Sequence, residues 1–202
     1  MPLWPPSIIG RDRIYVTIYR NKLRHNRRSI RLKGYDYSQA GAYFITICTQ
    51  NRECLFGDVT DGRMVANDVG RMIERWWGKL SNKFPFAKND EYMVMPNHFH
   101  GIVIIVGADL CVCPDPRCAQ CEPGAHTGAP LPAIVQWFKT MTTNEYICCV
   151  KRHGWQPFAG RLWQRNYYEH IIRDDDELNR AREYITNNPA QWELDRENPD
   201  YR

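Results

Sequence analysis

The segment His-Phe-His-Gly-Ile-Val-Ile-Ile-Val, from residue 98 to residue 106, constrains the fold most. Its last five residues are apolar on both faces of an extended chain, which is typical of a central strand. Side chains alternate between faces along a strand, so His98 and His100 point to one side while Phe99 packs into the opposite layer. We therefore expect a sheet whose central strand carries two neighbouring imidazoles.

The other periodic stretches predict strands and helices that alternate around this one. The expected strands cover residues 42–50, 92–95, 98–106 and 162–172, and the expected helices cover residues 69–80, 134–141 and 174–188. Asp174 to Glu177 supply a cap and an acidic first turn for the last helix, which must stop before Pro189. This order predicts an α+β fold in which helices cover an antiparallel sheet.

The chain of 202 residues has the length of one compact domain with tails. We place a basic arm at residues 1–34, the folded domain at 35–192, an aperiodic cysteine-bearing insertion loop at 107–132 and a C-terminal tail at 193–202. The net charge is only +4, but Arg and Lys crowd the arm against a single acid, Asp12. Such an arm gains counterion release along a polyanion, although a solvated tail has the same composition.

The N-terminus has no secretory signal, so we expect the chain in the cytoplasm, where cysteines are reduced. No apolar run approaches the roughly 20 residues that span a bilayer, so no membrane partner is expected. The insertion loop concentrates four of the cysteines: Cys111, Cys113, Cys118 and Cys121. They would suffice for a structural zinc site, but their spacing is cramped and we favour a reduced loop.

His98 and His100 on one strand face are suited to clamp a divalent ion, because imidazole is a common metal ligand. A pair of packing histidines has the same pattern, and the same spacing occurs in unrelated metalloenzymes. Tyr184 and Asn188, four residues apart near the end of the last helix, share one helix face. If that helix packs beside the two histidines, Asn188 completes the metal ligands and Tyr184 reaches a bound phosphate. A rim tyrosine on an ordinary amphipathic helix is the alternative.

Four segments, spread in the same order over residues 29–192, resemble the single-tyrosine transposases of the HUH superfamily, in particular the branch associated with repetitive extragenic palindromes. They are Arg-Leu-Lys-Gly-Tyr-Asp-Tyr at 31–37, Pro-Asn-His-Phe-His-Gly at 96–101, Leu-Trp-Gln-Arg-Asn-Tyr-Tyr-Glu-His-Ile-Ile-Arg at 162–173, and the tyrosine helix that ends in Asn-Asn-Pro at 187–189. The basic arm before Arg28 and the cysteine loop are not part of that pattern.

The resemblance implies the ferredoxin-like, RNA-recognition-like sheet of HUH endonucleases, with His98, His100 and Asn188 as metal ligands and Tyr184 as nucleophile. It implies cleavage and joining of single-stranded hairpin or palindromic DNA through a 5′-phosphotyrosine, with Mg²⁺ or Mn²⁺. Either a monomer or a homodimer fits it. Cationic side chains expected near the DNA are Arg28, Arg31, Lys33, Lys139, Arg161, Arg165 and Arg173.

Three alternatives stay open. Tyr167 or Tyr168 would replace Tyr184 as nucleophile, with Glu169 or His170 as base or ligand, but strand tyrosines usually pack. A nucleic-acid-binding module with an RNA-recognition-like sheet and no catalysis would use the histidines only for packing or stacking. A zinc hydrolase would use His98 and His100 as its ligands, and activity with Mg²⁺ or Mn²⁺ after chelation of zinc would exclude it.

Overall fold

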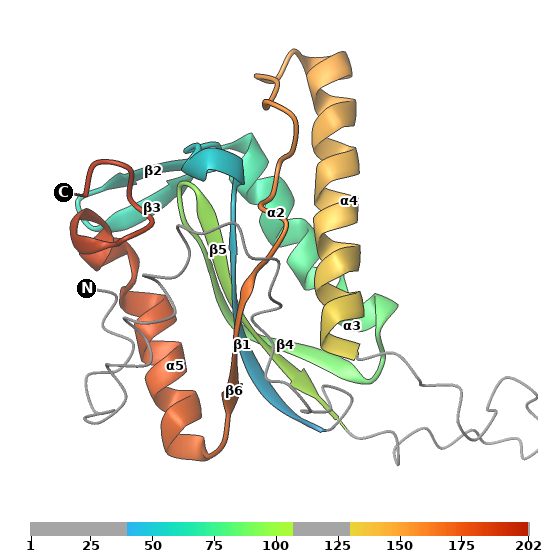
Figure 1. The fold of residues 1–202 in the computed structure, drawn as a ribbon, viewed down its shortest axis with the longest axis vertical. Coiled ribbons are helices and arrows are strands. Elements are labelled where there is room, and N and C mark those ends of the chain that lie inside the picture. The colour runs from blue at the N-terminus through green and yellow to red at the C-terminus, as the bar shows by residue number, and fades with distance from the viewer. Residues whose placement is uncertain (1–39, 107–129, 202) are drawn as a thin grey trace, which may run out of the picture.

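The computed structural model describes residues 40–106 and 130–201, which form a sheet with helices on both sides (Figure 1). Four antiparallel strands lie in the order β4-β5-β1-β6. Their bounds are Gly41–Cys48 for β1, Ala87–Val94 for β4, His98–Ile105 for β5 and Tyr168–Ile172 for β6. The strand with the two histidines, β5, lies between β4 and β1, so its predicted central position is confirmed.

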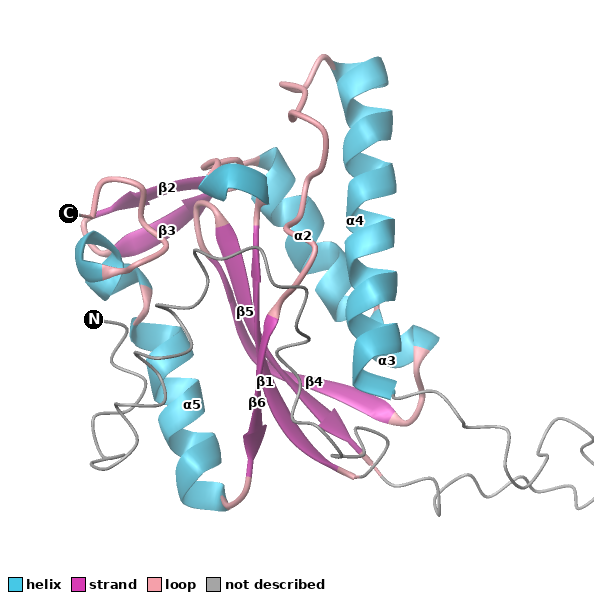
Figure 2. Cartoon of the chain, viewed as in Figure 1, coloured by secondary structure: helices cyan, strands magenta, loops and turns pink. Residues whose placement is uncertain are grey.

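Two helices connect these strands and give the sheet a ferredoxin-like topology. Helix α2, Asp68–Gly78, lies between β1 and β4 in the chain, and helix α4, Pro130–His153, lies between β5 and β6. The order strand, helix, strand, strand, helix, strand is the split βαβ arrangement of ferredoxin-like domains. Both helices cover the same face of the sheet (Figure 2). The predicted α+β fold class is therefore confirmed.

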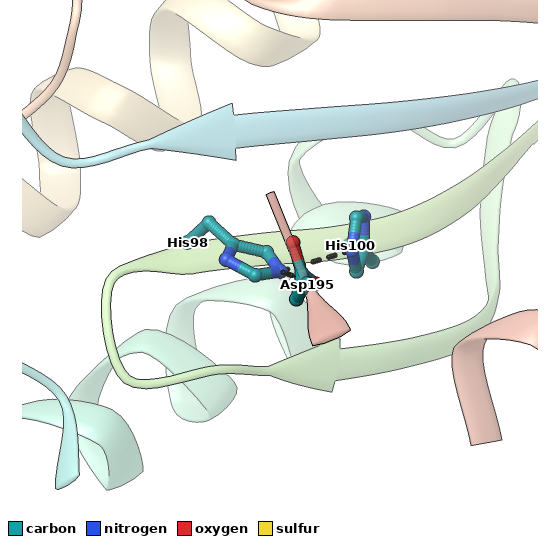
Figure 3. A group of neighbouring side chains, drawn as sticks. All are labelled: His98, His100 and Asp195. Carbon is teal, nitrogen blue, oxygen red and sulfur yellow. Dashed lines mark hydrogen bonds and ion pairs between the residues drawn. The ribbon is translucent and has the colours of Figure 1, made fainter. Parts of the chain in front are cut away.

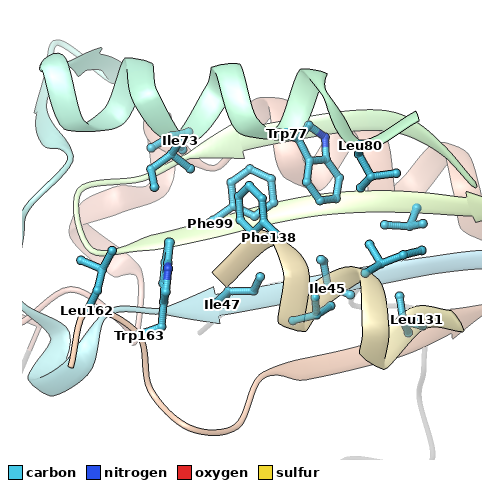
Figure 4. Close-up of a cluster of buried hydrophobic side chains, with 14 of the residues drawn as sticks. Ile45, Ile47, Ile73, Trp77, Leu80, Phe99, Leu131, Phe138, Leu162 and Trp163 are labelled. Atoms are coloured by element: carbon cyan, nitrogen blue, oxygen red, sulfur yellow. The ribbon is translucent and has the colours of Figure 1, made fainter. Parts of the chain in front are cut away.

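The main hydrophobic core lies between this face and the two helices (Figure 4). Phe99 is fully buried there, with ring centroids 4.7 Å from Trp77 of α2 and 5.1 Å from Phe138 of α4. Phe99 thus packs opposite the two histidines, as the alternation along β5 predicts. Trp77 is fully buried, while Trp76 and Trp137 pack against the core and are only partly buried.

Helix α2 forms because an apolar stripe and an N-terminal cap coincide. The Asn67 side chain accepts a hydrogen bond from the Gly70 backbone N–H, which satisfies one of the free donors at the helix start. The buried stripe includes Val69, Met72, Ile73 and Trp77, which lie on one face of the helix. A short further helix, α3, runs over Leu80–Lys83 and buries Leu80.

A hairpin between β1 and α2 was not among the predicted elements. It consists of β2, Gly57–Thr60, and β3, Arg63–Ala66, and a 3-10 turn, η2 at Gln50–Arg52, precedes it. The two strands are joined by Asp61 and Gly62, which both have positive φ, at 50° and 69°. Asp-Gly is a strong hairpin signal in a sequence, but strands of four residues are too short for a recognisable apolar alternation.

Two expected boundaries differ from the structure. Helix α4 begins at Pro130, before the expected end of the insertion loop at residue 132, and extends over 24 residues. The strand expected at 162–172 is regular only from Tyr168 onward. Leu162 and Trp163 are buried without belonging to a strand: Trp163 makes an isolated bridge to Thr49, and its indole N–H donates to the Thr142 hydroxyl. Their apolar character reflects core packing and does not indicate a strand.

A third helix covers the other face of the sheet (Figure 1). Helix α5, Asp175–Asn187, begins after the cap Asp174, whose carboxylate accepts from the Glu177 backbone N–H at 2.7 Å. It is followed by a 3-10 helix, η4, at Pro189–Leu194. A separate small core joins α5 to the sheet and contains Phe44, Ile102, Ile172, Ala181 and Ile185. The sheet is thus covered on both faces.

Several predictions lie outside the described residues: the basic arm at 1–34 and the four cysteines of the proposed zinc loop. Within the described parts of the chain, no helix is long and apolar enough to cross a membrane. Location in the cytoplasm and the oligomeric state stay predictions.

Candidate metal centre and tyrosine helix

His98 and His100 are buried side by side on β5, on the sheet face that α5 covers (Figure 3). Their Nε2 atoms are 3.0 Å apart. Two cis ligands of an octahedral ion, each at about 2.1 Å, would be separated by about 3.0 Å. The imidazole pair therefore has the spacing of a bidentate site for a divalent ion.

Each imidazole is oriented by a hydrogen bond at its other nitrogen. His98 Nδ1 lies 2.9 Å from Oδ1 of Asn97, the residue before β5. His100 Nδ1 lies 2.8 Å from the hydroxyl of Thr46, which stands directly opposite His100 on β1. Such partners fix the ring orientation of metal-binding histidines and leave the second nitrogen for the ion.

Burial lowers the pKa of both histidines below the ordinary value. For His98, the carboxylates of Asp195 and Glu197 and the Asn188 side chain act in the opposite direction. For His100, the neighbouring charge on His98 adds to the effect of burial, and the pKa falls well below its usual value. Both rings are therefore neutral near pH 7, and neutral imidazole is the form that binds a metal.

Asp195 joins the two histidines, and it was missed in the sequence analysis. Its carboxylate is buried, and Oδ2 lies 3.8 Å from His98 Nε2. Ligand atoms of His98, His100 and Asp195 all lie within 4.8 Å of one another, the one such grouping among the residues that the structure describes. The only available signal was an acid soon after the tyrosine helix, in the segment expected to be a tail.

Asn188 lies directly after α5 and also faces this group. Its side chain is buried, and Nδ2 donates to Asp195 Oδ2 at 3.4 Å. Its amide oxygen is buried and lacks a well-formed hydrogen bond. A buried acceptor without such a partner is costly, and a cation would satisfy it. The four side chains together offer two nitrogens and two oxygens, a donor set that fits Mn²⁺ or Mg²⁺ as well as zinc.

Tyr184, one helical turn before Asn188, lies over the same part of the sheet. Its ring centroid is 5.4 Å from that of His100 and 5.9 Å from that of Phe44 on β1. The end of the last helix therefore packs beside the two histidines in the same chain, which is the arrangement on which the sequence-based hypothesis depended. The roles assigned to these residues stay predictions.

A salt bridge fixes α5 against the edge strand β4. Arg182 donates through Nε to Asp90 Oδ1 at 2.9 Å and through Nη2 to Asp90 Oδ2 at 2.5 Å. These hydrogen bonds lower the pKa of the Asp90 carboxyl despite its partial burial. A bidentate salt bridge restricts the rotation of the two side chains more than a single hydrogen bond does. Arg182 therefore helps to set the position of Tyr184 on the same helix.

Tyr167 and Tyr168, the alternative nucleophiles, lie on opposite faces of the sheet. Tyr168 is on the α5 face, opposite Thr46 of β1, with its ring edge toward Phe44 at 6.4 Å. Tyr167 packs against the main core, and the Lys139 ammonium lies 5.4 Å from its ring centre. His170 is bound to Glu177 of α5 at 2.7 Å. Tyr168 is therefore the stronger of the two rivals to Tyr184, since it shares a sheet face with the metal-binding candidates.

The expected DNA-binding cations fall into three groups. Arg28, Arg31 and Lys33 lie outside the described residues. Arg161, Arg165 and Arg173 are exposed.

Lys139 is half-buried and donates to the carbonyl oxygens of Gln164, Arg165 and Asn166 at 3.0, 3.4 and 3.3 Å. Burial lowers its pKa to about 8. The Lys139 ammonium thus holds the segment before β6 in place through hydrogen bonds. A contact between Lys139 and DNA stays a prediction.

The described fold resembles two solved structures. One is a REP-associated tyrosine transposase bound to a REP hairpin, with a TM-score of 0.47 and 18% identity over 81% of this chain and 74% of that one. The other is a predicted transposase from Deinococcus radiodurans R1, with a TM-score of 0.42 and 15% identity over 79% of this chain and 97% of that one.

Comparison with known sequences gives a relative but no function. No family model matches the chain. An uncharacterized protein of Haemophilus influenzae is 42% identical over 173 residues, which are 85% of this chain and 92% of the relative. At this identity over nearly the whole length of the relative, the chain belongs to the same protein family as that Haemophilus influenzae protein.

Proposed function

We propose that this chain is a transposase-like, metal-dependent endonuclease and strand transferase that acts on single-stranded hairpin or palindromic DNA. Tyr184 is the nucleophile, and His98, His100, Asn188 and Asp195 hold the divalent ion. The observation that carries the proposal is the packing of the Tyr184 ring 5.4 Å from the His100 ring, beside a buried imidazole pair. The four sequence segments that resemble REP-associated tyrosine transposases support the same function.

The proposed reaction exchanges one phosphate ester for another. The Tyr184 oxygen attacks a DNA phosphorus and forms a phosphotyrosine, while the bond from phosphorus to the 3′ oxygen breaks and that oxygen leaves as a hydroxyl. A bound divalent ion supplies positive charge that offsets the growing charge on the phosphate oxygens. The ester energy stays in the phosphotyrosine, so a second 3′ hydroxyl can reverse the step and join a new DNA end.

The position of α5 favours this function over a non-catalytic RNA-recognition-like module. Such modules stack bases on aromatic side chains of an open sheet face. Here the face opposite α2 and α4 is occupied by α5, and Phe44 at its centre is buried against Ile185 and Tyr184. Bases cannot stack on Phe44 unless α5 leaves. The buried face instead holds polar, metal-binding side chains, which a stacking platform does not need.

The test is a covalent trapping experiment with the full chain. We expect a pool of single-stranded hairpins with randomised flanks, incubated with Mg²⁺ or Mn²⁺, to give a protein–DNA adduct that peptide mapping assigns to Tyr184. Tyr184→Phe should lose the adduct and keep hairpin binding. Tyr168→Phe is the matched control, because it removes the other candidate tyrosine hydroxyl from the same sheet face, and it should still form the adduct.

Two results would overturn the proposal. An adduct that maps to Tyr168 and persists in Tyr184→Phe would move the nucleophile to β6. Hairpin binding by the wild-type chain without cleavage of any member of the pool, with either ion, would favour the non-catalytic module.

A further inference from the structure

The side chain of Asn97 is fully buried between the imidazole of His98 and the turn at residues 195–198. We propose that Asn97 is the positioning residue of the metal centre: it holds His98 in the tautomer that presents Nε2, and it anchors the turn that carries Asp195. This inference rests on the proposed function, which supplies the metal. It assigns a structural cause to the placement of two of the four proposed ligands.

The hydrogen-bond partners of Asn97 determine which way its amide faces. Nδ2 donates to the backbone carbonyl oxygens of Arg52 at 3.1 Å and of Glu197 at 2.5 Å. A carbonyl oxygen can only accept, so the reverse orientation would place the amide oxygen against two other oxygens. Oδ1 must therefore face His98 Nδ1, which lies 2.9 Å away.

This orientation fixes the proton on His98. An amide oxygen only accepts, so the ring nitrogen beside it must be the donor, and neutral His98 carries its single proton on Nδ1. Nε2 is then left with a free lone pair, directed at Nε2 of His100 and at the Asp195 carboxylate. Thr46 cannot fix His100 in the same way, because a hydroxyl can both donate and accept.

The other end of the same amide acts on Asp195. The bond from Asn97 Nδ2 to Glu197 O holds a turn that closes through Asn198 N to Asp195 O at 3.0 Å. Within that turn, Glu197 N donates to Asp195 Oδ1 at 2.8 Å, which leaves Oδ2 toward His98. One buried amide thus aligns a nitrogen ligand from β5 with an oxygen ligand from beyond α5.

Arg52 supports the turn without contact to the histidine. Its guanidinium donates to Arg196 O at 3.0 Å and pairs with the Glu197 carboxylate at 2.9 Å. Arg52 and its neighbour Asn51 both adopt left-handed backbone conformations, with φ of 59° and 58°. Such conformations are uncommon for residues other than glycine. Arg52 offers a variant that loosens the turn and keeps the hydrogen bond between Asn97 and His98.

The first test measures the tautomer of His98 in the metal-free chain. We expect ¹⁵N spectra of the histidine-labelled protein at pH 7.5 to show a protonated Nδ1 and a bare Nε2, with the signal assigned by its loss in His98→Gln. Asn97→Leu, which removes the acceptor oxygen, should convert His98 to a mixture of tautomers. A wild-type His98 with its proton on Nε2 would overturn the proposal even if Asn97→Leu does not fold.

The second test measures Mn²⁺ binding by calorimetry. We expect Asn97→Leu to bind Mn²⁺ about 10- to 100-fold more weakly, the usual effect of removing a residue that orients a metal ligand. Arg52→Ala should weaken binding while leaving the His98 tautomer unchanged, because the Asn97 side chain and the backbone carbonyl of residue 52 both remain. A wild-type Mn²⁺ affinity or a wild-type His98 tautomer in a folded Asn97→Leu would overturn the proposal.

The two tests separate this inference from the proposed function. A wild-type chain with the Nδ1 proton but no affinity for Mn²⁺ or Mg²⁺ would refute the metal-dependent enzyme and leave the effect of Asn97 on His98 intact. Strong Mn²⁺ binding that is insensitive to Asn97→Leu would refute the inference and leave the enzyme intact.

Discussion

The Asp195 carboxylate lies 3.8 Å from Nε2 of His98, although the two residues are far apart in the chain. The contact is buried, and Asn188 donates to the same carboxylate oxygen. A carboxylate placed beside two neutral imidazoles supplies the negative charge that a divalent ion requires. The segment after α5 therefore contributes to the candidate site.

The first prediction concerns that carboxylate. Asp195→Asn should weaken Mn²⁺ binding by about tenfold or more, because it removes the only formal negative charge among the proposed ligands. Asp200→Asn, a change of the same type at an exposed position in the same segment, should bind Mn²⁺ as the wild type does. Calorimetric titration of both variants checks the prediction, and equal affinities would remove Asp195 from the ligand set.

The second prediction is a loss of stability in acid. Because the pKa of both buried histidines is lowered in the folded chain, the unfolded chain binds more protons below pH about 6.5. The folded chain therefore has its full stability above that pH. It loses stability relative to the unfolded chain as the pH falls toward the lowered pKa values of the two buried histidines. In metal-free protein, urea unfolding should show a fall of at most about 1.4 kcal/mol per pH unit for each histidine.

A variant with both His98→Gln and His100→Gln is the control for this slope. Glutamine does not titrate, so the slope between pH 6.5 and 5 should flatten whatever the absolute stability of the variant. The same slope in the variant and the wild type would attribute the acid sensitivity to other groups.

The third prediction concerns Gly101, which follows His100 on β5. A Cβ atom at this position would lie 2.7 Å from Trp77 and 2.8 Å from Phe99, both of which are fully buried. Gly101→Ala should therefore destabilise the chain by about 1–3 kcal/mol through overpacking. Gly78→Ala is the matched control at the end of α2, where a Cβ atom would meet nothing within 4 Å. Urea unfolding of both variants measures the difference, and equal stabilities would contradict the close packing at Gly101.

The fourth prediction separates the position of Tyr184 from stability. Arg182→Ala removes the bidentate salt bridge with Asp90. Because the arginine side chain is 40% exposed, the free energy of unfolding should fall by only about 1 kcal/mol or less. Hydrogen exchange should nevertheless accelerate along α5, because the helix loses its attachment to β4. Arg71→Ala, which breaks the exposed pair with Asp68 on α2, should leave exchange in α5 unchanged. Unaltered exchange in Arg182→Ala would show that the small core alone holds α5.

Much of the fold followed from local patterns. The apolar run after His100 and the alternation around Phe99 predicted a central strand with the imidazoles together, since strand geometry repeats every two residues. The apolar stripe of α2 and the cap and acidic first turn of α5 likewise predicted those helices, because each feature depends only on residues within a few turns of one another. The β2–β3 hairpin was not predicted, because strands of four residues contain too few positions for a period to emerge.

The site was predictable only in part. His98 with His100, and Tyr184 with Asn188, were paired by the period of a single strand and a single helix. Asp195 and Asn97 had no comparable signal: an acid in a polar segment and an asparagine beside a proline are common in turns. Lys139 shows that a charge alone does not reveal its partner. The sequence suggests a contact with DNA, and the structure shows the ammonium donating to three backbone carbonyls.

The sequence by itself determined which residues share a face within one element, because the periods of strands and helices are properties of the backbone. Only the tertiary structure decided which faces meet. The packing of α5 on the sheet brings Tyr184 to His100, and the anchoring of the 195–198 turn by Asn97 and Arg52 brings Asp195 to His98. Those contacts join residues far apart in the chain, and they depend on the summed packing of buried surfaces, which no local pattern of residues encodes.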